Sequence, residues 1–203
     1  MDEPISFVHI INLNDDLLFP WLDLYETAFP PNEKILISSL LKEIRGNNSD
    51  ETREIHIVAI LDKEDLFIGM AMYQLPVDKP VGVLWYVAVV PSQRSKGWGS
   101  KVYEGILSHI NPKIHKALVF EVEIPGEANS SPDAEHRIHF YQKNGAKLLT
   151  GIHYVQSVGW HQPPIPMHLM IHPLQPMDAE TAFNLTYSIF GDALQKTGSL
   201  ALE

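Results

Sequence analysis

The stretch VAVVPSQRSKGWGSKVYEGIL, residues 87–107, is the most informative pattern in the chain. Its aliphatic start predicts a strand, a polar loop follows, and Gly97 and Gly99 open a segment with helical periodicity. The apolar positions Val102 and Ile106 lie four residues apart, so one face of this helix can pack on a core. The sequence therefore predicts a strand, a loop and a helix in immediate succession.

The start of the predicted helix has the features of an anion-binding site. Free backbone amides at a helix N-terminus attract phosphate, and glycine lets a ligand approach the backbone closely. Arg94 and Lys96 add positive charge at the same place. The alternative is a tight turn in which these two cations are incidental. Neither the GxGxxG of dinucleotide-binding folds nor the GxxxxGK[ST] of nucleoside triphosphatases is present.

Periodicity and turn residues predict strands and helices along the whole chain. Strands are expected at Ile5–Ile11, Ile55–Leu61, Leu66–Leu75, Val83–Val90, Ala117–Ile124, Lys147–Val158 and Met167–Ile171. Helices are expected at Asp15–Phe29, Asn32–Ile44, Gly97–Ile110, Pro132–Asn144 and Asp178–Gln195. The strand, helix and strand between Val83 and Ile124 indicate a parallel crossover inside a mostly antiparallel sheet.

Two motifs together resemble the GNAT N-acetyltransferases. The loop from Gln93 to Gly99 has the form Q/RxxGxG/A of the family's motif A. The segment HFYQKNGAKLL is similar to motif B, although Ala146 replaces the usual aromatic residue. With the strand order, the resemblance covers Ile5–Ile171. It implies an α/β fold (α+β in some schemes), with a mixed, mostly antiparallel sheet of about seven strands and helices on both faces.

The resemblance also implies acetyl-coenzyme A as the cosubstrate. In the family, the loop amides hold the pyrophosphate and the fourth strand pairs with the pantetheine arm. The residues that this assigns to the coenzyme are Val87, Ala88, Val89, Arg94, Ser95, Lys96, Gly97, Trp98, Gly99 and Ser100.

Acetyl transfer to an amine needs a base for the amine proton and an acid for the departing thiolate. In LVFEVEI, Glu121 and Glu123 alternate with apolar residues, so both carboxylates are expected on one face, toward one cleft. The alternative is that they form salt bridges, for instance with Arg137. Many GNAT members carry the base glutamate on the fourth strand, but VLWYVAVV has none. Which glutamate serves as the base, if either does, stays open.

Tyr141 lies in the second motif and matches the tyrosine that serves much of the family as general acid. A phenol is protonated at neutral pH and can donate to a leaving thiolate. The alternative is a buried tyrosine bonded to a backbone carbonyl. Catalytic candidates are therefore Tyr141, Glu121 and Glu123.

The ten histidines of the chain include two pairs with suggestive spacing. His136 and His139 are three apart on a predicted helix, whereas His168 and His172 are four apart on a strand. No cysteine or compact carboxylate set completes a ligand group, so we expect no metal.

The resemblance implies that the acceptor enters between the first two helices and the loop that joins the last strands. The corresponding segments are FPPNEK, residues 29–34, and GWHQPPIP, residues 159–166. Trp160 and His161 could line this entrance or serve the loop's structure. The aromatic residues of the first helix are expected in the core: Trp21, Tyr25 and Phe29.

Composition narrows the class of protein. The chain has 203 residues, no cysteine and a formal charge of −10. We expect one GNAT-type domain at residues 1–173 and a C-terminal helical tail at 174–203 that packs on it. The charge argues against nucleic acid as a partner and mildly favours cationic substrates. Since no long apolar segment is present, we expect a cytoplasmic protein without membrane contact, and a homodimer stays open.

These observations favour an N-acetyltransferase that acts on a primary amine of a small molecule or a protein. A second hypothesis is a GNAT-like module that binds acetyl-coenzyme A without efficient catalysis, which the missing fourth-strand glutamate permits. A third is an unrelated α/β domain for protein interaction, which would not bind the coenzyme.

Overall fold

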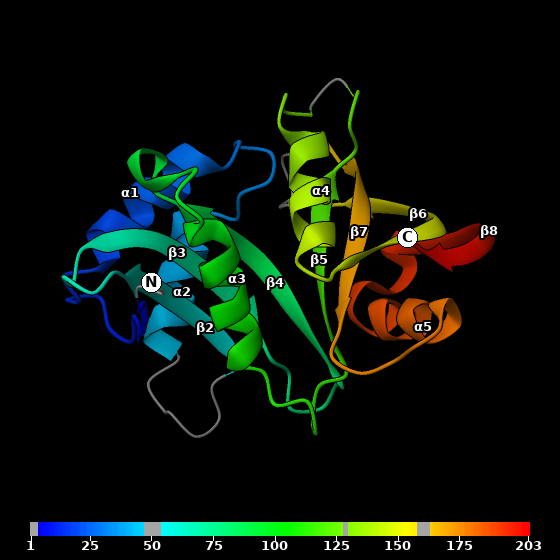
Figure 1. The fold of residues 1–203 in the computed structure, drawn as a ribbon, viewed down its shortest axis with the longest axis horizontal. Coiled ribbons are helices and arrows are strands. Elements are labelled where there is room, and N and C mark those ends of the chain that lie inside the picture. Colours follow the sequence, from blue (N-terminus) through cyan, green and yellow to red (C-terminus); the bar gives the residue numbers. More distant parts are fainter. Residues whose placement is uncertain (1–3, 47–53, 128–129, 158–162) are drawn as a thin grey trace. The chain divides into compact units, whose positions relative to one another are not determined.

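The structure is a computed structural model that describes residues 4–46, 54–127, 130–157 and 163–203 (Figure 1). The helices are α1 (Leu18–Ala28), α2 (Ile37–Gly46), α3 (Trp98–Ser108), α4 (Ala134–Lys143) and α5 (Ala179–Phe190). The strands are β1 (Ser6–His9), β2 (Ile55–Leu61), β3 (Phe67–Gln74), β4 (Val81–Val89), β5 (Ala117–Glu123), β6 (Lys147–Gln156), β7 (Ile165–Pro173) and β8 (Leu194–Leu202). Short 3₁₀ turns are η2 (Pro91–Gln93) and η3 (Gly191–Ala193). None of the helices within these ranges is long and apolar enough to cross a membrane.

The strands form a sheet in the order β1-β2-β3-β4-β5-β7-β6-β8. β4 and β5 pair in parallel, as the predicted crossover requires. The pairs β1–β2, β2–β3, β5–β7, β6–β7 and β6–β8 are antiparallel. The predicted fold class, a mixed and mostly antiparallel sheet, is therefore confirmed, with eight strands instead of about seven.

The additional strand lies where the sequence predicts only helix. The predicted helix Asp178–Gln195 is wrong at its end, because α5 stops at Phe190 and Gly191 has a positive φ of 54°. β8 then pairs with β6 at the edge of the sheet. Its exposed residues Gln195–Ser199 are polar or glycine, so no apolar alternation marks the strand in the sequence. The segment 174–203 is thus a helix and a strand, not a helical tail.

Helix α2 begins later than its predicted cap at Asn32. It starts at Ile37, because backbone groups of the preceding residues bond to a tyrosine instead of to a helical turn. The Tyr86 hydroxyl accepts a hydrogen bond from the Ile35 amide at 3.1 Å and donates one to the Glu33 carbonyl at 2.9 Å.

The chain divides into two compact units, and β4 starts in the second and ends in the first. The first unit contains β1 to β3, the end of β4 and helices α1 to α3. α1 and α2 pack on Ile57 and Ala59 of β2. Trp21 and Tyr25 are fully buried in this cluster and Phe29 packs against it, so their predicted place in the core is confirmed.

Helix α3 packs on the opposite face of the first unit's strands. Phe7 of β1 pairs with Ile60, which is adjacent to the Ala59 that faces α1 and α2. The Phe7 ring lies against Gly105 of α3, and a Cβ at Gly105 would be 2.2 Å from the Phe7 Cζ atom. Only glycine therefore fits this contact without movement of the helix or the ring.

The second unit holds the start of β4, strands β5 to β8, and helices α4 and α5 (Figure 1). Val119 of β5 belongs to the core with Ala182 and Leu185 of α5. Phe120, the next residue, contacts Tyr141 of α4 with ring centroids 4.4 Å apart. Because successive strand residues face opposite sides, α4 and α5 cover opposite faces of β5.

Candidate active site

The loop predicted to bind phosphate joins β4 to α3. After η2, Ser95 and Gly97 adopt positive φ angles of 62° and 82°, and Gly97 is the N-cap of the helix. No side chain caps α3, and its first turn carries no acidic residue. The first amides of α3, from Trp98 onward, therefore have no intrahelical acceptor. This is the geometry of a helix N-terminus that can receive an anion.

Space and charge at the loop also suit an anion. Apart from Gly97 itself and its two neighbours in the chain, no described residue has an atom within 4 Å of the place that a Cβ on Gly97 would occupy. Arg94 and Lys96 are exposed, and their hydrogen-bond partners among the described residues are uncharged: the Val89 carbonyl at 3.2 Å and the Gln93 Oε1 at 3.0 Å. Neither cation forms an ion pair with a described residue. Their positive charge is therefore not neutralised by the described chain.

The strand that precedes the loop has one edge outside the sheet pairing. β4 pairs with β5 over Val81–Val83 only, so this register gives Val87, Ala88 and Val89 no partner on β5. Along its other edge β4 neighbours β3, where Gly69 permits a close approach of the Ala88 carbonyl. Unpaired strand edges are the places where an extended ligand adds hydrogen bonds.

Glu123, the last residue of β5, is saturated by donors. Its Oε1 accepts a hydrogen bond from the Ser131 amide at 3.0 Å. Its Oε2 accepts from the Ser131 hydroxyl and from Arg137 Nη1, both at 2.8 Å. The Glu123 side chain is 6% exposed and that of Arg137 40%. The salt bridge stated as the alternative role is thus present, and it ties the link after β5 to α4.

Glu121 has a different set of partners, all of them uncharged. One carboxyl oxygen accepts a hydrogen bond from the Tyr154 hydroxyl, and the other accepts from Gln156 Nε2 at 2.7 Å. Burial raises the pKa of the Glu121 carboxyl, against these two hydrogen bonds, which lower it. The two carboxylates share a face of β5 but are held by separate groups. Of the two, Glu121 is the better disposed to take up a proton.

Tyr141 is buried on α4, against Phe120 at 4.4 Å and Phe140 at 5.1 Å between ring centroids. Burial raises the pKa of Tyr141 to about 12, although the charge of Arg137 lowers it. The hydroxyl is therefore protonated at neutral pH, as a general acid must be. Its contact with Phe120 places it over the face of β5 opposite Glu121. Both residues flank the part of β5 that lies beyond the pairing with β4.

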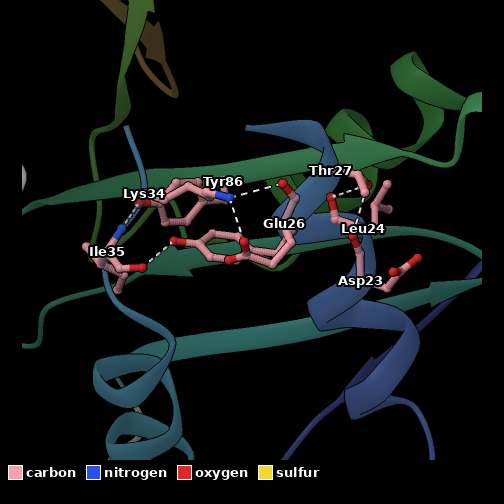
Figure 2. Close-up of polar contacts among 8 residues, drawn as sticks. Asp23, Leu24, Glu26, Thr27, Lys34, Ile35 and Tyr86 are labelled. Atoms are coloured by element: carbon pink, nitrogen blue, oxygen red, sulfur yellow. Dashed lines mark hydrogen bonds and ion pairs between the residues drawn. The ribbon is translucent and has the colours of Figure 1, made fainter. Parts of the chain in front are cut away.

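Polar side chains fix the segment between α1 and α2, where the acceptor is expected to enter (Figure 2). Lys34 Nζ donates to the Glu26 carbonyl at 3.0 Å and to its carboxylate at 2.9 Å. The Tyr25 hydroxyl donates to the Ile35 carbonyl at 3.0 Å, beside the bonds that Tyr86 makes to the same segment. The other part of the expected entrance, Trp160 and His161, lies outside the described residues.

The histidines separate into two environments. His136, His139 and His168 line a pocket of about 630 Å³ beside α4. His172 instead lies under Gly145, with its Cε1 3.1 Å from the place of a Cβ there. Across the ranges that the structure describes, no three His, Cys, Asp or Glu residues are grouped so that they could hold a metal ion.

The profile of the acetyltransferase (GNAT) family matches residues 18–146 of the chain. The chain belongs to the GNAT family. The match includes the loop before α3, both glutamates of β5 and Tyr141.

Solved structures of other GNAT proteins resemble the chain. One is described as an acetyltransferase of the GNAT family from Bacteroides thetaiotaomicron; it is 25% identical with a TM-score of 0.70, over 92% of this chain and 98% of that one. A GNAT protein from Desulfovibrio desulfuricans is 17% identical with a TM-score of 0.58, over 85% and 100%. The spermidine N-acetyltransferase of Vibrio cholerae, in complex with CoA and spermine, is 12% identical with a TM-score of 0.58, over 82% and 94%. Among curated proteins, none matches the chain.

The described residues of this GNAT chain fit the coenzyme of the family. The uncapped start of α3, the open space at Gly97 and the two exposed cations suit a pyrophosphate. The edge of β4 that lies beyond its pairing with β5 suits an extended arm. Sequence reasoning missed Tyr86, Tyr154 and Gln156. The only signal for the last two is their alternation on β6, which puts their side chains on one face.

Proposed function

We propose that the chain is an N-acetyltransferase that transfers the acetyl group of acetyl-coenzyme A to a primary amine. The observation that carries the proposal is the uncapped N-terminus of α3, with open space at Gly97 and exposed cations at Arg94 and Lys96. The phosphates of such a cosubstrate carry the negative charge that would neutralise Arg94, Lys96 and the start of α3. The acetyltransferase family supplies the reaction type.

The reaction requires two proton transfers, and the second unit offers a group for each. The amine nitrogen attacks the thioester carbonyl, the carbon–sulfur bond breaks, and the amine gives up a proton. Glu121 is the base that takes this proton, and burial raises the pKa of its carboxyl. The Tyr141 hydroxyl gives a proton to the departing thiolate. Glu123 is not needed as a base, since its oxygens already hold three hydrogen bonds.

We favour a small amine as the acceptor over a protein amine. The chain's charge of −10 attracts cationic molecules. A structural neighbour, by its description, is a spermidine N-acetyltransferase bound to spermine. The cytoplasmic location stays a prediction, which fractionation checks, and the question of a homodimer stays open and can be decided by light scattering.

A coenzyme-binding module without catalysis is the second candidate, because β4 carries no glutamate. The two candidates agree on binding and differ on turnover. Acetyl-coenzyme A should raise the melting temperature, since it binds only the folded state. Replacement of both Arg94 and Lys96 by alanine should weaken this shift, whereas Lys113→Ala, an exposed lysine elsewhere, should not. No shift with the wild type at millimolar coenzyme would exclude both.

Turnover is tested with a panel of amines and detection of the released thiol. The N-acetyltransferase should release thiol with at least one amine, and the Tyr141→Phe variant should be about 100- to 10,000-fold slower at saturating coenzyme. Coenzyme affinity should change little, because the ring and its packing stay. A turnover within about threefold of wild type would assign Tyr141 a structural role, worth about 1 kcal/mol of stability.

A further inference from the structure

Gln156 contains a buried acceptor that no described group satisfies. Its Nε2 donates to Glu121, but its Oε1 has no hydrogen-bond partner among the described residues and is closed off from bulk water. An unsatisfied buried carbonyl is costly, so such an atom in a native protein calls for an explanation.

The neighbouring carboxyl has a related deficit. Glu121 is enclosed with hydrogen bonds from Tyr154 and Gln156, and no described lysine, arginine or histidine pairs with it. Glu123, two residues along the same strand, does have its cation in Arg137. Among the described residues, a half-buried carboxylate without a cation and a buried carbonyl without a donor therefore occur side by side.

Local rearrangement does not remove the deficit. A half-turn of the Gln156 amide exchanges its oxygen and nitrogen, so the atom without a partner becomes Nε2. If Glu121 is protonated and donates to the turned amide, the same nitrogen is still left over. What is missing is a donor to the Gln156 carbonyl and a positive charge beside the Glu121 carboxylate. A primary ammonium supplies both in a single group.

We infer that Gln156 and Glu121 form the subsite for the acceptor's ammonium group, with Gln156 Oε1 accepting one N–H and Glu121 receiving another. The inference rests on the proposed function and adds Gln156 as its amine-binding residue. Glu121 retains partly exposed surface, which leaves a route from solvent. Glu121 takes the first proton from the ammonium, so the neutral amine keeps its hydrogen bond to Gln156 while its lone pair attacks. The second proton, which the nitrogen loses as the carbon–sulfur bond breaks, balances the one that the departing thiolate receives, and Glu121 returns its own proton to solvent. Tyr154 is a positioning residue that fixes the other carboxyl oxygen.

The test uses amines that differ only in the number of N–H groups. Butylamine and benzylamine serve as acceptors, and their N,N-dimethyl counterparts, which have no primary amine left to acetylate, serve as competitive inhibitors. Wild type should bind a primary ammonium more tightly than its dimethyl counterpart, because the latter has a single N–H. In Gln156→Leu the acceptor KM should rise about 10- to 100-fold. The preference, defined as the Kd of the dimethyl amine divided by that of the primary amine, should fall to near one.

Controls separate this subsite from a structural role. The coenzyme-induced melting shift of Gln156→Leu should match wild type, and His153→Gln, an exposed position on the same strand, should leave KM and the preference unchanged. An unchanged preference in Gln156→Leu, with thiol release retained, overturns the subsite but not the proposed function. If that variant does not fold, an equal affinity of wild type for both amine types overturns the subsite equally. Absence of thiol release by wild type with every amine overturns both.

Discussion

The middle and the end of strand β5 carry the same residue in opposite environments. Glu123 at the end is held by a guanidinium, an amide and a hydroxyl. Glu121 in the middle is held by a phenol and an amide, and within the part of the chain that the structure describes no cation pairs with it. In the proposed function, the carboxylate that is paired with a cation holds the structure, and the one without a described cation exchanges the proton. Alternation along the strand predicts their common face but not this difference, because the partners come from other elements.

The largest expected effect is on turnover. Glu121→Gln keeps the shape and removes the base, so kcat should fall about 100- to 10,000-fold. Glu123→Gln should leave kcat within about tenfold of wild type, since its role is to hold the link to α4. Steady-state kinetics with the same amine compares the two variants. If Glu123→Gln showed the greater loss of turnover, the assignment would be reversed.

A pH profile sharpens the contrast. The base must be ionised, so kcat/KM should fall as pH falls through the raised pKa of Glu121. The Tyr154 hydrogen bond lowers that pKa, and Tyr154→Phe should therefore raise it further and move the acidic limb to higher pH. At a pH on this limb, each unit of movement lowers kcat/KM about tenfold. A profile of Tyr154→Phe that overlays wild type would show that Glu121 is not the titrating group.

The order of the two variants should reverse for stability. Glu123→Gln leaves Arg137 without its counter-charge and should lower the free energy of unfolding by about 1–2 kcal/mol, less than for a fully buried pair because Arg137 is partly exposed. The pKa of Glu121 is higher in the folded than in the unfolded state. The stability that Glu121 contributes is therefore fully present below the unfolded pKa and is lost as pH rises through the folded pKa. Glu121→Gln should not suffer this loss of stability, so the variant should be at least as stable as wild type at neutral pH. Urea unfolding at pH 7 measures both, and a Glu121→Gln variant less stable than Glu123→Gln would contradict the comparison.

The smallest change in stability is expected at Tyr86, which lies in the first unit and serves as a reference for Glu123 in the second. Tyr86→Phe keeps the ring and removes hydrogen bonds to Ile35 and Glu33, so stability should fall by about 1 kcal/mol. Combined with Glu123→Gln, the two losses should add within about 0.5 kcal/mol, because the residues share no partner. Unfolding of the single and double variants gives this sum. A clear departure from additivity would mean that the environment of Glu123 extends beyond its own unit.

Features determined by local pattern could be predicted from the sequence. The loop before α3 depends on Gly97, on the strand that precedes it and on nearby cations, all within a few residues. The parallel pairing of β4 and β5 follows from the order of strand, helix and strand. These predictions do not depend on which residue from a distant part of the sequence contacts the segment.

Features determined by distant partners could not be predicted. The strand β8 is polar on its exposed stretch and forms only because β6 offers a free edge. In the sequence, Tyr86 cannot be told from an apolar strand residue. Only the structure shows that its hydroxyl accepts a hydrogen bond from the backbone before α2. The same holds for Tyr154 and Gln156, which lie more than 30 residues from Glu121, at sequence separations of 33 and 35.

The contact of Gly105 with Phe7 is one of the points at which α3 packs closely against β1. The helix start at Trp98 lies about 10 Å along the axis from that contact, at 1.5 Å per residue. A stiff helix does not bend to absorb a displacement at one end, so a tilt there moves the free amides at the other. The direction in which those amides point thus depends also on the first strand of the chain, and not only on the residues that adjoin an anion.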